Sequence, residues 1–189
     1  LGELDKWIIN RLEFTINNVT INMEKYDFNQ ASSFLYNFVY DDFCSQYLEM
    51  SKVALNGNDE EKKNATYQTL LYCLKNIILL IYPYTPFIAE ELYLSLPEHL
   101  ESIMLESYPV YDETLIDESV NNEIALLFDC IKDVRTHKLD NKLAPNAKLD
   151  LFLKFKVEVF EDFVTYLKRF TFSENVIISE KDLTNMNGS

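Results

Sequence analysis

The side chains of this chain that could do chemistry suit binding better than catalysis. His99 and His137 are isolated, and neither has a second metal ligand at a suitable spacing. Cys44 has no nearby base to activate it, so we expect a small core residue and not a nucleophile. The three cysteines are far apart and include no CxxC pair, which argues against a disulfide framework or a zinc site. We therefore expect no catalytic residue and no metal site.

Candidate binding residues are amide, aromatic and basic side chains at a few places. They are Asn10 and Arg11 in a first predicted helix, Phe28 and Asn29 at the joint after it, Tyr40 and Tyr47 in a second helix, and Lys132, Arg135 and Lys138 at three-residue steps in a later one. Each has a structural alternative. Arg11 fits a solvated surface arginine, and Phe28 fits a hydrophobic staple onto the next helix. Tyr40 and Tyr47 share a helical face with Phe43, which is typical of a core stripe.

Apolar spacing predicts an antiparallel bundle of about four helices in the first part of the chain. Apolar residues recur at three- and four-residue steps over 4–23, which predicts a helix about 30 Å long. Further stripes follow over 31–55 and 59–81, and Pro86 opens a fourth helix that Pro97 closes. Asp27 or Asn29 can cap the second helix, and the joints are short, which favours antiparallel neighbours.

The rest of the chain predicts one more helix and a small α/β unit. Residues 98–114 are irregular and acidic, and the apolar spacing over 116–138 is helical. Alternating apolar residues over 149–155 predict a strand, and an amphipathic segment over 159–170 leads to a short strand over 175–179. We therefore expect a mainly α fold, with a helical-bundle domain at 1–114 and a helix plus βαβ-like appendage at 115–189.

Charge is unevenly distributed along the chain. The net charge is -14, and residues 76–131 contain no Lys or Arg, whereas 7 of the 17 basic residues fall between Lys132 and Lys156. An acidic body with one basic segment suits nucleic-acid contact over a limited patch, and equally an acidic surface that binds nothing. No apolar run approaches the roughly 20 residues that span a bilayer, and no secretory leader opens the sequence, so we expect a cytoplasmic protein with no membrane partner.

Four segments resemble the part of valyl-tRNA synthetases that follows their catalytic core. They are 5–12 (DKWIINRL), 26–31 (YDFNQA), 43–52 (FCSQYLEMSK) and 82–93 (YPYTPFIAEELY). The sequence departs from the family pattern at Lys6, where arginine is usual, at Ser45 and Gln46, where Asp-Trp is usual, and at Tyr82, where histidine is usual. The last segment is shared with isoleucyl and leucyl relatives, and 43–49 favours the valyl family. The resemblance covers about residues 3–180.

The resemblance implies the anticodon-binding domain of a class I aminoacyl-tRNA synthetase, whose parent joins valine to tRNA with ATP and Mg²⁺. It implies that the candidate residues contact the anticodon stem-loop of valine tRNA through bases and phosphates. The HIGH and KMSKS signatures and a basic coiled-coil arm are absent, so we expect a monomeric fragment that needs no cofactor, activates no amino acid alone and serves the catalytic domain of its parent chain. The alternatives are the same domain of an isoleucyl enzyme, or an acidic helical protein–protein interaction module.

Overall fold

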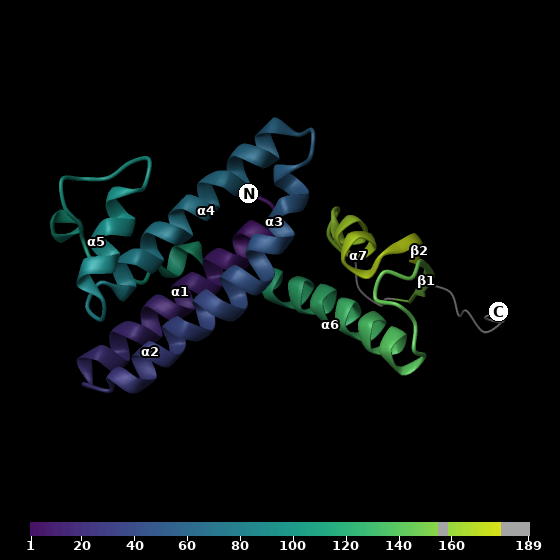
Figure 1. Ribbon diagram of the computed structural model, residues 1–189, viewed down its shortest axis with the longest axis horizontal. Coiled ribbons are helices and arrows are strands. Elements are labelled where there is room, and N and C mark those ends of the chain that lie inside the picture. The colour runs from purple at the N-terminus through teal and green to yellow at the C-terminus, as the bar shows by residue number, and fades with distance from the viewer. Residues whose placement is uncertain (155–158, 179–189) are drawn as a thin grey trace. The chain divides into compact units, whose positions relative to one another are not determined.

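The computed structural model describes residues 1–154 and 159–178, which belong to two compact units. The first unit is Leu1–Asn121, and the second begins at Asn122. A helical bundle is followed by a small α/β unit, so the predicted fold class is confirmed (Figure 1). The predicted strand ends at Phe155 and Ser179 lie outside the described residues. Within the described ranges, no helix is both long and apolar enough to cross a membrane.

The first unit is built from helices that run back and forth beside one another (Figure 1). They are α1 (Glu3–Glu24), α2 (Phe28–Asn37), the π-helical segment η1 (Phe38–Tyr47), α3 (Leu48–Leu55), α4 (Glu60–Ile81) and α5 (Pro86–Leu94). Helix α1 packs against α2, η1 and α4, while α3 and α5 each pack against α4. The predicted irregular segment 98–114 contains the short 3-10 turn η2 (Ile103–Leu105) and enters a second, η3 (Glu113–Leu115).

Local signals in the sequence set the ends of these helices. The Asp27 carboxylate accepts a hydrogen bond from the backbone N–H of Gln30 and so caps α2. Asp59 caps α4 through the N–H groups of Glu61 and Lys62, and Pro86 occupies the first turn of α5. The predicted stripe of α1 is buried, apart from Met23, and its core residues are Leu4, Trp7, Ile8, Leu12, Ile16 and Val19.

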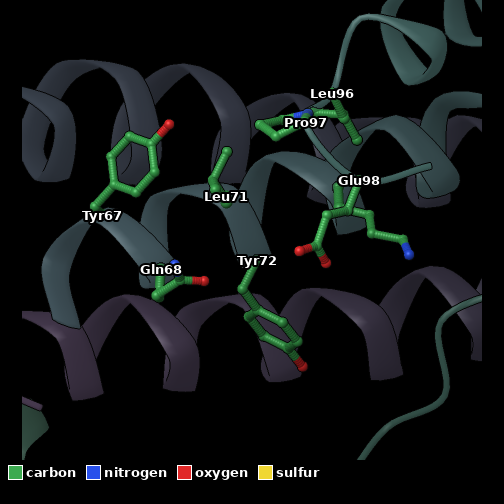
Figure 2. Close-up of a pocket in the computed structure, with 8 residues that line it drawn as sticks. Tyr67, Gln68, Leu71, Tyr72, Leu96, Pro97 and Glu98 are labelled. Atoms are coloured by element: carbon green, nitrogen blue, oxygen red, sulfur yellow. The ribbon is translucent and has the colours of Figure 1, made fainter. Parts of the chain in front are cut away.

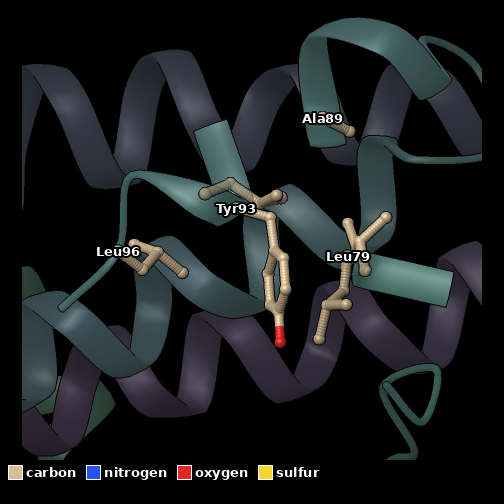
Figure 3. Packing of buried hydrophobic residues seen from close by; sticks show 6 residues of the cluster. Leu79, Ala89, Tyr93 and Leu96 are labelled. Atoms are coloured by element: carbon tan, nitrogen blue, oxygen red, sulfur yellow. The ribbon is translucent and has the colours of Figure 1, made fainter. Parts of the chain in front are cut away.

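A second apolar cluster lies where the end of α4 meets α5. Tyr93 is fully buried there among Leu79, Ala89 and Leu96 (Figure 3). Its hydroxyl donates to Oε1 of Glu106 at 2.6 Å and accepts from the N–H of Leu100 at 2.7 Å. A buried tyrosine hydroxyl needs such partners, so these two bonds also fix the irregular segment after α5.

The second predicted helix contains a π-helical stretch that the apolar spacing did not indicate. Each π turn takes about one residue more than an α turn, because its hydrogen bonds span five residues instead of four. The Ser45 hydroxyl follows the same spacing and donates to the carbonyl of Tyr40 at 2.6 Å. The extra residues rotate the faces of the helix, and Cys44 lies on its exposed side. The prediction that Cys44 is a core residue is therefore wrong.

The second unit contains most of α6 (Glu118–Asp140), followed by β1 (Leu149–Leu153), α7 (Phe163–Thr171) and β2 (Ser173–Ile178). The two strands are parallel, with Leu151 opposite Val176, so the expected strand–helix–strand unit is present. Helix α7 begins later than the predicted residue 159. The division between the units falls inside α6, after Asn121.

Candidate nucleic-acid interface

Arg11 is held in place by an ion pair on the surface of the first unit. Its Nε donates to Oδ2 of Asp42 at 2.8 Å, and its guanidinium lies 5.3 Å from the centre of the Phe14 ring. Neither Nη atom has a hydrogen-bond partner among the described residues, and the side chain is 39% exposed. Burial raises the pKa of the Asp42 carboxyl, and the bond to Arg11 opposes that rise. Arg11 is thus a positioned cation with free donors, which suits a phosphate or a base edge.

Asn10, the neighbour of Arg11, has an interior position instead. Only 4% of the residue is exposed. Its amide donates to the carbonyl of Asp117 at 2.6 Å and to Oδ1 of Asn121 at 3.2 Å, and its Oδ1 accepts from the N–H of Asp117 at 2.9 Å. These bonds tie α1 to the start of α6, which explains why the first unit extends to Asn121. The side chain of Asn10 is unavailable to RNA in this fold.

The two candidate tyrosines of the second predicted helix lie on different sides of it. Tyr40 is 59% exposed, whereas Tyr47 is completely buried and its hydroxyl donates to Oδ1 of Asp5 at 2.6 Å. An α-helix would place residues seven apart on the same face, but the π turns of η1 separate them. Tyr47 therefore belongs to the core, as the core-stripe alternative predicted, and this candidate offers no ring face to a base.

Tyr36 was not among the predicted candidates, yet it forms an exposed pair of stacked rings with Tyr40. The two ring centres are 5.5 Å apart and their planes differ by 6°. Tyr36 is 62% exposed, and neither hydroxyl is hydrogen-bonded within the described residues. The spacing of four residues was the available signal, because such tyrosines share a helical face. Ring faces of this kind stack on unpaired bases.

The joint between α1 and α2 also exposes aromatic rings. Tyr26 is 81% exposed and has a left-handed backbone with a φ of 58°. Phe28 is 50% exposed and meets the Tyr26 ring edge to face, with centres 6.3 Å apart. Asn29 is exposed beside them. Phe28 and Asn29 are therefore accessible, as the hypothesis of an RNA contact requires.

The basic stripe of α6 is divided between surface and interior. Lys132 and Arg135 are exposed, but only 2% of Lys138 is exposed. The Lys138 ammonium donates to the carbonyls of Pro145, Ala147 and Thr171 at 3.1, 2.6 and 2.6 Å. An ammonium has three donors, and all three are used here. The prediction that Lys138 lies on the surface with the other two is wrong, so it cannot bind a phosphate.

A cavity of about 360 Å³ in the first unit is less suited to an anion. It lies between α4 and the turn at residues 96–98, and Figure 2 shows Tyr67, Gln68 and Tyr72 around it. Lys75 lines this cavity but pairs with Glu106 at 2.5 Å, and the carboxylate of Glu98 also lines it. The local charge therefore disfavours a phosphate. No cluster of potential metal ligands occurs in the described part of the chain.

Comparison with known proteins bears on what these surfaces do. A family model for the anticodon-binding domain of tRNA ligase matches residues 5–153. A valine–tRNA ligase of Staphylococcus aureus (strain MRSA252) is 36% identical over 98% of this chain and 22% of its own length. That of Staphylococcus saprophyticus is 34% identical over the same shares, and that of Lactobacillus acidophilus is 35% identical over 93% of this chain and 20% of its own length.

The chain thus spans about a fifth of the length of these curated relatives. The family match extends from α1 through β1 and includes the ion-paired Arg11, the Tyr36–Tyr40 pair and the exposed end of the basic stripe. On this evidence the chain belongs to the family of anticodon-binding domains of tRNA ligases.

Proposed function

We propose that this chain binds the anticodon stem-loop of valine tRNA on behalf of a valine–tRNA ligase. The observation that carries the proposal is the exposed, parallel Tyr36–Tyr40 pair in a member of the anticodon-binding family. A base stacked on an aromatic side chain gains about 1–3 kcal/mol, and an anticodon presents unpaired bases. The relatives named above are all valine–tRNA ligases, which favours valine over isoleucine.

The remaining accessible candidates have complementary roles. Arg11 offers its Nη donors to a phosphate or a base edge, and Phe28 and Asn29 offer a ring and an amide at the joint between α1 and α2. Lys132 and Arg135 bind phosphates, which carry no sequence information. With a net charge of -14, the chain should bind RNA weakly, and salt should weaken the binding strongly.

The chemistry of the ligase belongs to the parent chain in this proposal. The parent attaches valine to tRNA with ATP and Mg²⁺ in the cytoplasm, and its catalytic domain is the second partner of this monomeric chain. The sequence contains neither HIGH nor KMSKS, so this chain alone should form no valyl-adenylate. Valine-dependent exchange of pyrophosphate into ATP by the pure chain would contradict that part of the proposal.

The test is a titration of wild-type, Tyr36→Ala and Tyr40→Ala protein with a valine anticodon hairpin and with one whose anticodon is swapped. Each variant should weaken cognate binding by about 1–3 kcal/mol and reduce the preference over the swapped hairpin. Tyr67→Ala is the matched control, since it removes an exposed tyrosine from α4 in the same unit. Circular dichroism first checks the helices. A wild-type protein that ignores the anticodon would refute the proposal.

A protein-interaction role is the second candidate, and the outer surface of α5 favours it. Phe87 is 90% exposed and Ile88 59%, and Met104 and Leu105 after α5 are 75% and 63% exposed. Contiguous exposed apolar side chains mark contact sites, and the lack of Lys and Arg over 76–131 disfavours RNA there. If hairpins fail to bind, Phe87→Ser and Met104→Ser should be tested for loss of association with a partner protein.

A further inference from the structure

A second cavity, of about 390 Å³, lies in the second unit and has no role in the function proposed above. Its walls are mainly apolar and come from the end of α6, the loop before β1 and the end of α7. Leu139, Leu143 and Pro145 line it together with Phe170 and Phe172. The volume falls in the range of small-ligand sites, so one flat aromatic group fits inside.

Lys138 holds the rim of this cavity in shape. Its three bonds join α6 to two carbonyls of the loop before β1 and to the carbonyl of Thr171 at the end of α7. The ammonium also lies 5.7 Å from the centre of the Phe172 ring. Because every Nζ donor is used, Lys138 binds no ligand itself. It is a positioning residue for the aromatic wall.

Phe172 has a backbone conformation that bulky residues rarely adopt. Its φ of 55° and ψ of 37° are left-handed, and the residue ends α7 where glycine or asparagine is usual. The ring lines the cavity, yet the residue is 52% exposed. A strained aromatic residue at the mouth of a cavity points to a binding role.

The charge around the cavity favours an anionic ligand. Arg135 lines it, and its Nη2 makes only a long bond of 3.4 Å to the carbonyl of Phe170. The segment between Lys132 and Lys156 carries 7 of the 17 basic residues of an otherwise acidic chain. Aromatic walls with one arginine at the edge match a nucleobase joined to a phosphate.

We propose that this cavity binds one unpaired nucleotide of RNA. The base enters between the Phe172 ring and Leu139, and the Arg135 guanidinium binds the adjoining phosphate. This inference rests on the proposed function, since it assumes an RNA partner, and it adds a contact in the second unit that the anticodon-reading surface does not include. Stacking tolerates any base, so the site should show little sequence preference.

The experiment uses the whole 189-residue chain and a short single-stranded RNA that carries 2-aminopurine, whose fluorescence falls when the base stacks. Wild-type protein should quench the fluorescence. Leu139→Ala and Phe172→Gly should each weaken the quenching interaction about tenfold, because each removes one wall. Leu139 is 76% exposed on a helix and alanine is a good helix former, while glycine accepts the left-handed backbone of residue 172, so both variants should fold.

Arg135→Gln and its matched control Arg169→Gln separate the cavity from general charge. Both remove one exposed arginine from the second unit, but Arg169, on α7, does not line the cavity. Only Arg135→Gln should weaken RNA binding, measured by 2-aminopurine quenching, by severalfold. It should also reduce the steepness of the plot of log affinity against log salt concentration by about 0.7. Equal effects of the two substitutions would show that bulk charge, and not the cavity, holds the RNA.

Anticodon hairpins separate failure of this inference from failure of the proposed function. If the cavity variants quench like wild type while the wild type still prefers its cognate hairpin, the cavity proposal is overturned and the anticodon proposal stands. If the wild type neither quenches 2-aminopurine nor distinguishes hairpins, both are overturned. Weaker quenching in the cavity variants with unchanged hairpin preference supports both.

Discussion

The Nε of Arg11 lies 2.8 Å from Oδ2 of Asp42, and this ion pair joins α1 to the π-helical segment η1. Asp42 is 9% exposed, so its carboxylate has little water to replace a lost partner. We expect Arg11→Ala to lower the free energy of unfolding by about 1–3 kcal/mol at neutral pH, because it leaves a buried acceptor unsatisfied. Urea denaturation measures this. The double variant Arg11→Ala/Asp42→Asn should regain part of the loss, and an additive result would contradict the coupling.

The same pair provides a clean test of Arg11 as an RNA ligand. Asp42→Asn removes the carboxylate but keeps the guanidinium, so hairpin affinity should stay the same or rise as one negative charge disappears. Arg11→Ala should weaken hairpin binding by about 1–3 kcal/mol, as for a lost charged contact. Both variants break the ion pair, but only Arg11→Ala removes the guanidinium, so a loss of affinity confined to Arg11→Ala is the expected result. Equal affinities would remove Arg11 from the interface.

Thiol labelling tests the exposure of Cys44 directly. Cys44 is exposed, whereas Cys73 is completely buried and desolvation raises the pKa of its thiol. Because the thiolate is the reactive form, Cys44 should react rapidly with a thiol reagent and Cys73 only on unfolding. Cys44→Ser should abolish the fast phase. A fast phase that survives this substitution and disappears in Cys130→Ser would mean that Cys44 is inside the bundle.

Much of the helical bundle follows from short-range signals. The stripe of α1 persists over several turns, and Asp27, Asp59 and Pro86 act on backbone groups within a few residues of themselves. Apolar periodicity and caps of this kind are visible in any sequence. The alternation over β1 likewise predicted a strand, which pairs with β2 as expected.

The register of η1 was not predictable in this way. Tyr47 bonds to Asp5 and Asp42 bonds to Arg11, so residues far apart in sequence fix which side of the helix faces inward. That rotation buries Tyr47, and it removes one candidate from the interface. The burial of Lys138 was not predictable from the sequence either. Its three hydrogen-bond acceptors are backbone carbonyls, which every residue has. Only the folded chain shows that Lys132 and Lys138 have different environments.

Lys138 and Lys132 should therefore respond differently to the same substitution. Lys138→Met leaves three carbonyls without their donor, although methionine fills a similar volume, and should cost about 2–4 kcal/mol of stability. Lys132→Met changes an exposed side chain and should alter stability by less than about 0.5 kcal/mol. Thermal unfolding followed by circular dichroism distinguishes the two. If Lys138→Met is as stable as Lys132→Met, the buried position of Lys138 is wrong.

The buried carboxyl of Asp5 should make stability depend on pH. It accepts hydrogen bonds from Tyr47 at 2.6 Å and from Thr66 at 3.3 Å, and no lysine or arginine among the described residues pairs with it. Desolvation raises the pKa of Asp5 above its ordinary value of 3.8, and the hydrogen bonds offset only part of the rise. The folded state thus binds this proton more tightly than the unfolded state does. Stability from this group is fully present below pH 3.8 and is lost as the pH rises through the raised pKa.

Asp5→Asn should remove that component of the pH dependence. Asparagine keeps an acceptor for Tyr47 and can donate to the Thr66 hydroxyl, so these two contacts survive without a charge, while the N–H of Gly2 loses Oδ2 as its acceptor. The variant lacks the titrating carboxyl, so it should gain stability relative to wild type as the pH rises from 4 to 7. Urea denaturation at both pH values measures this gain. Asp41→Asn, which removes the same charge from an exposed position, is the control. If both substitutions change the pH dependence equally, net charge and not the buried carboxyl is responsible.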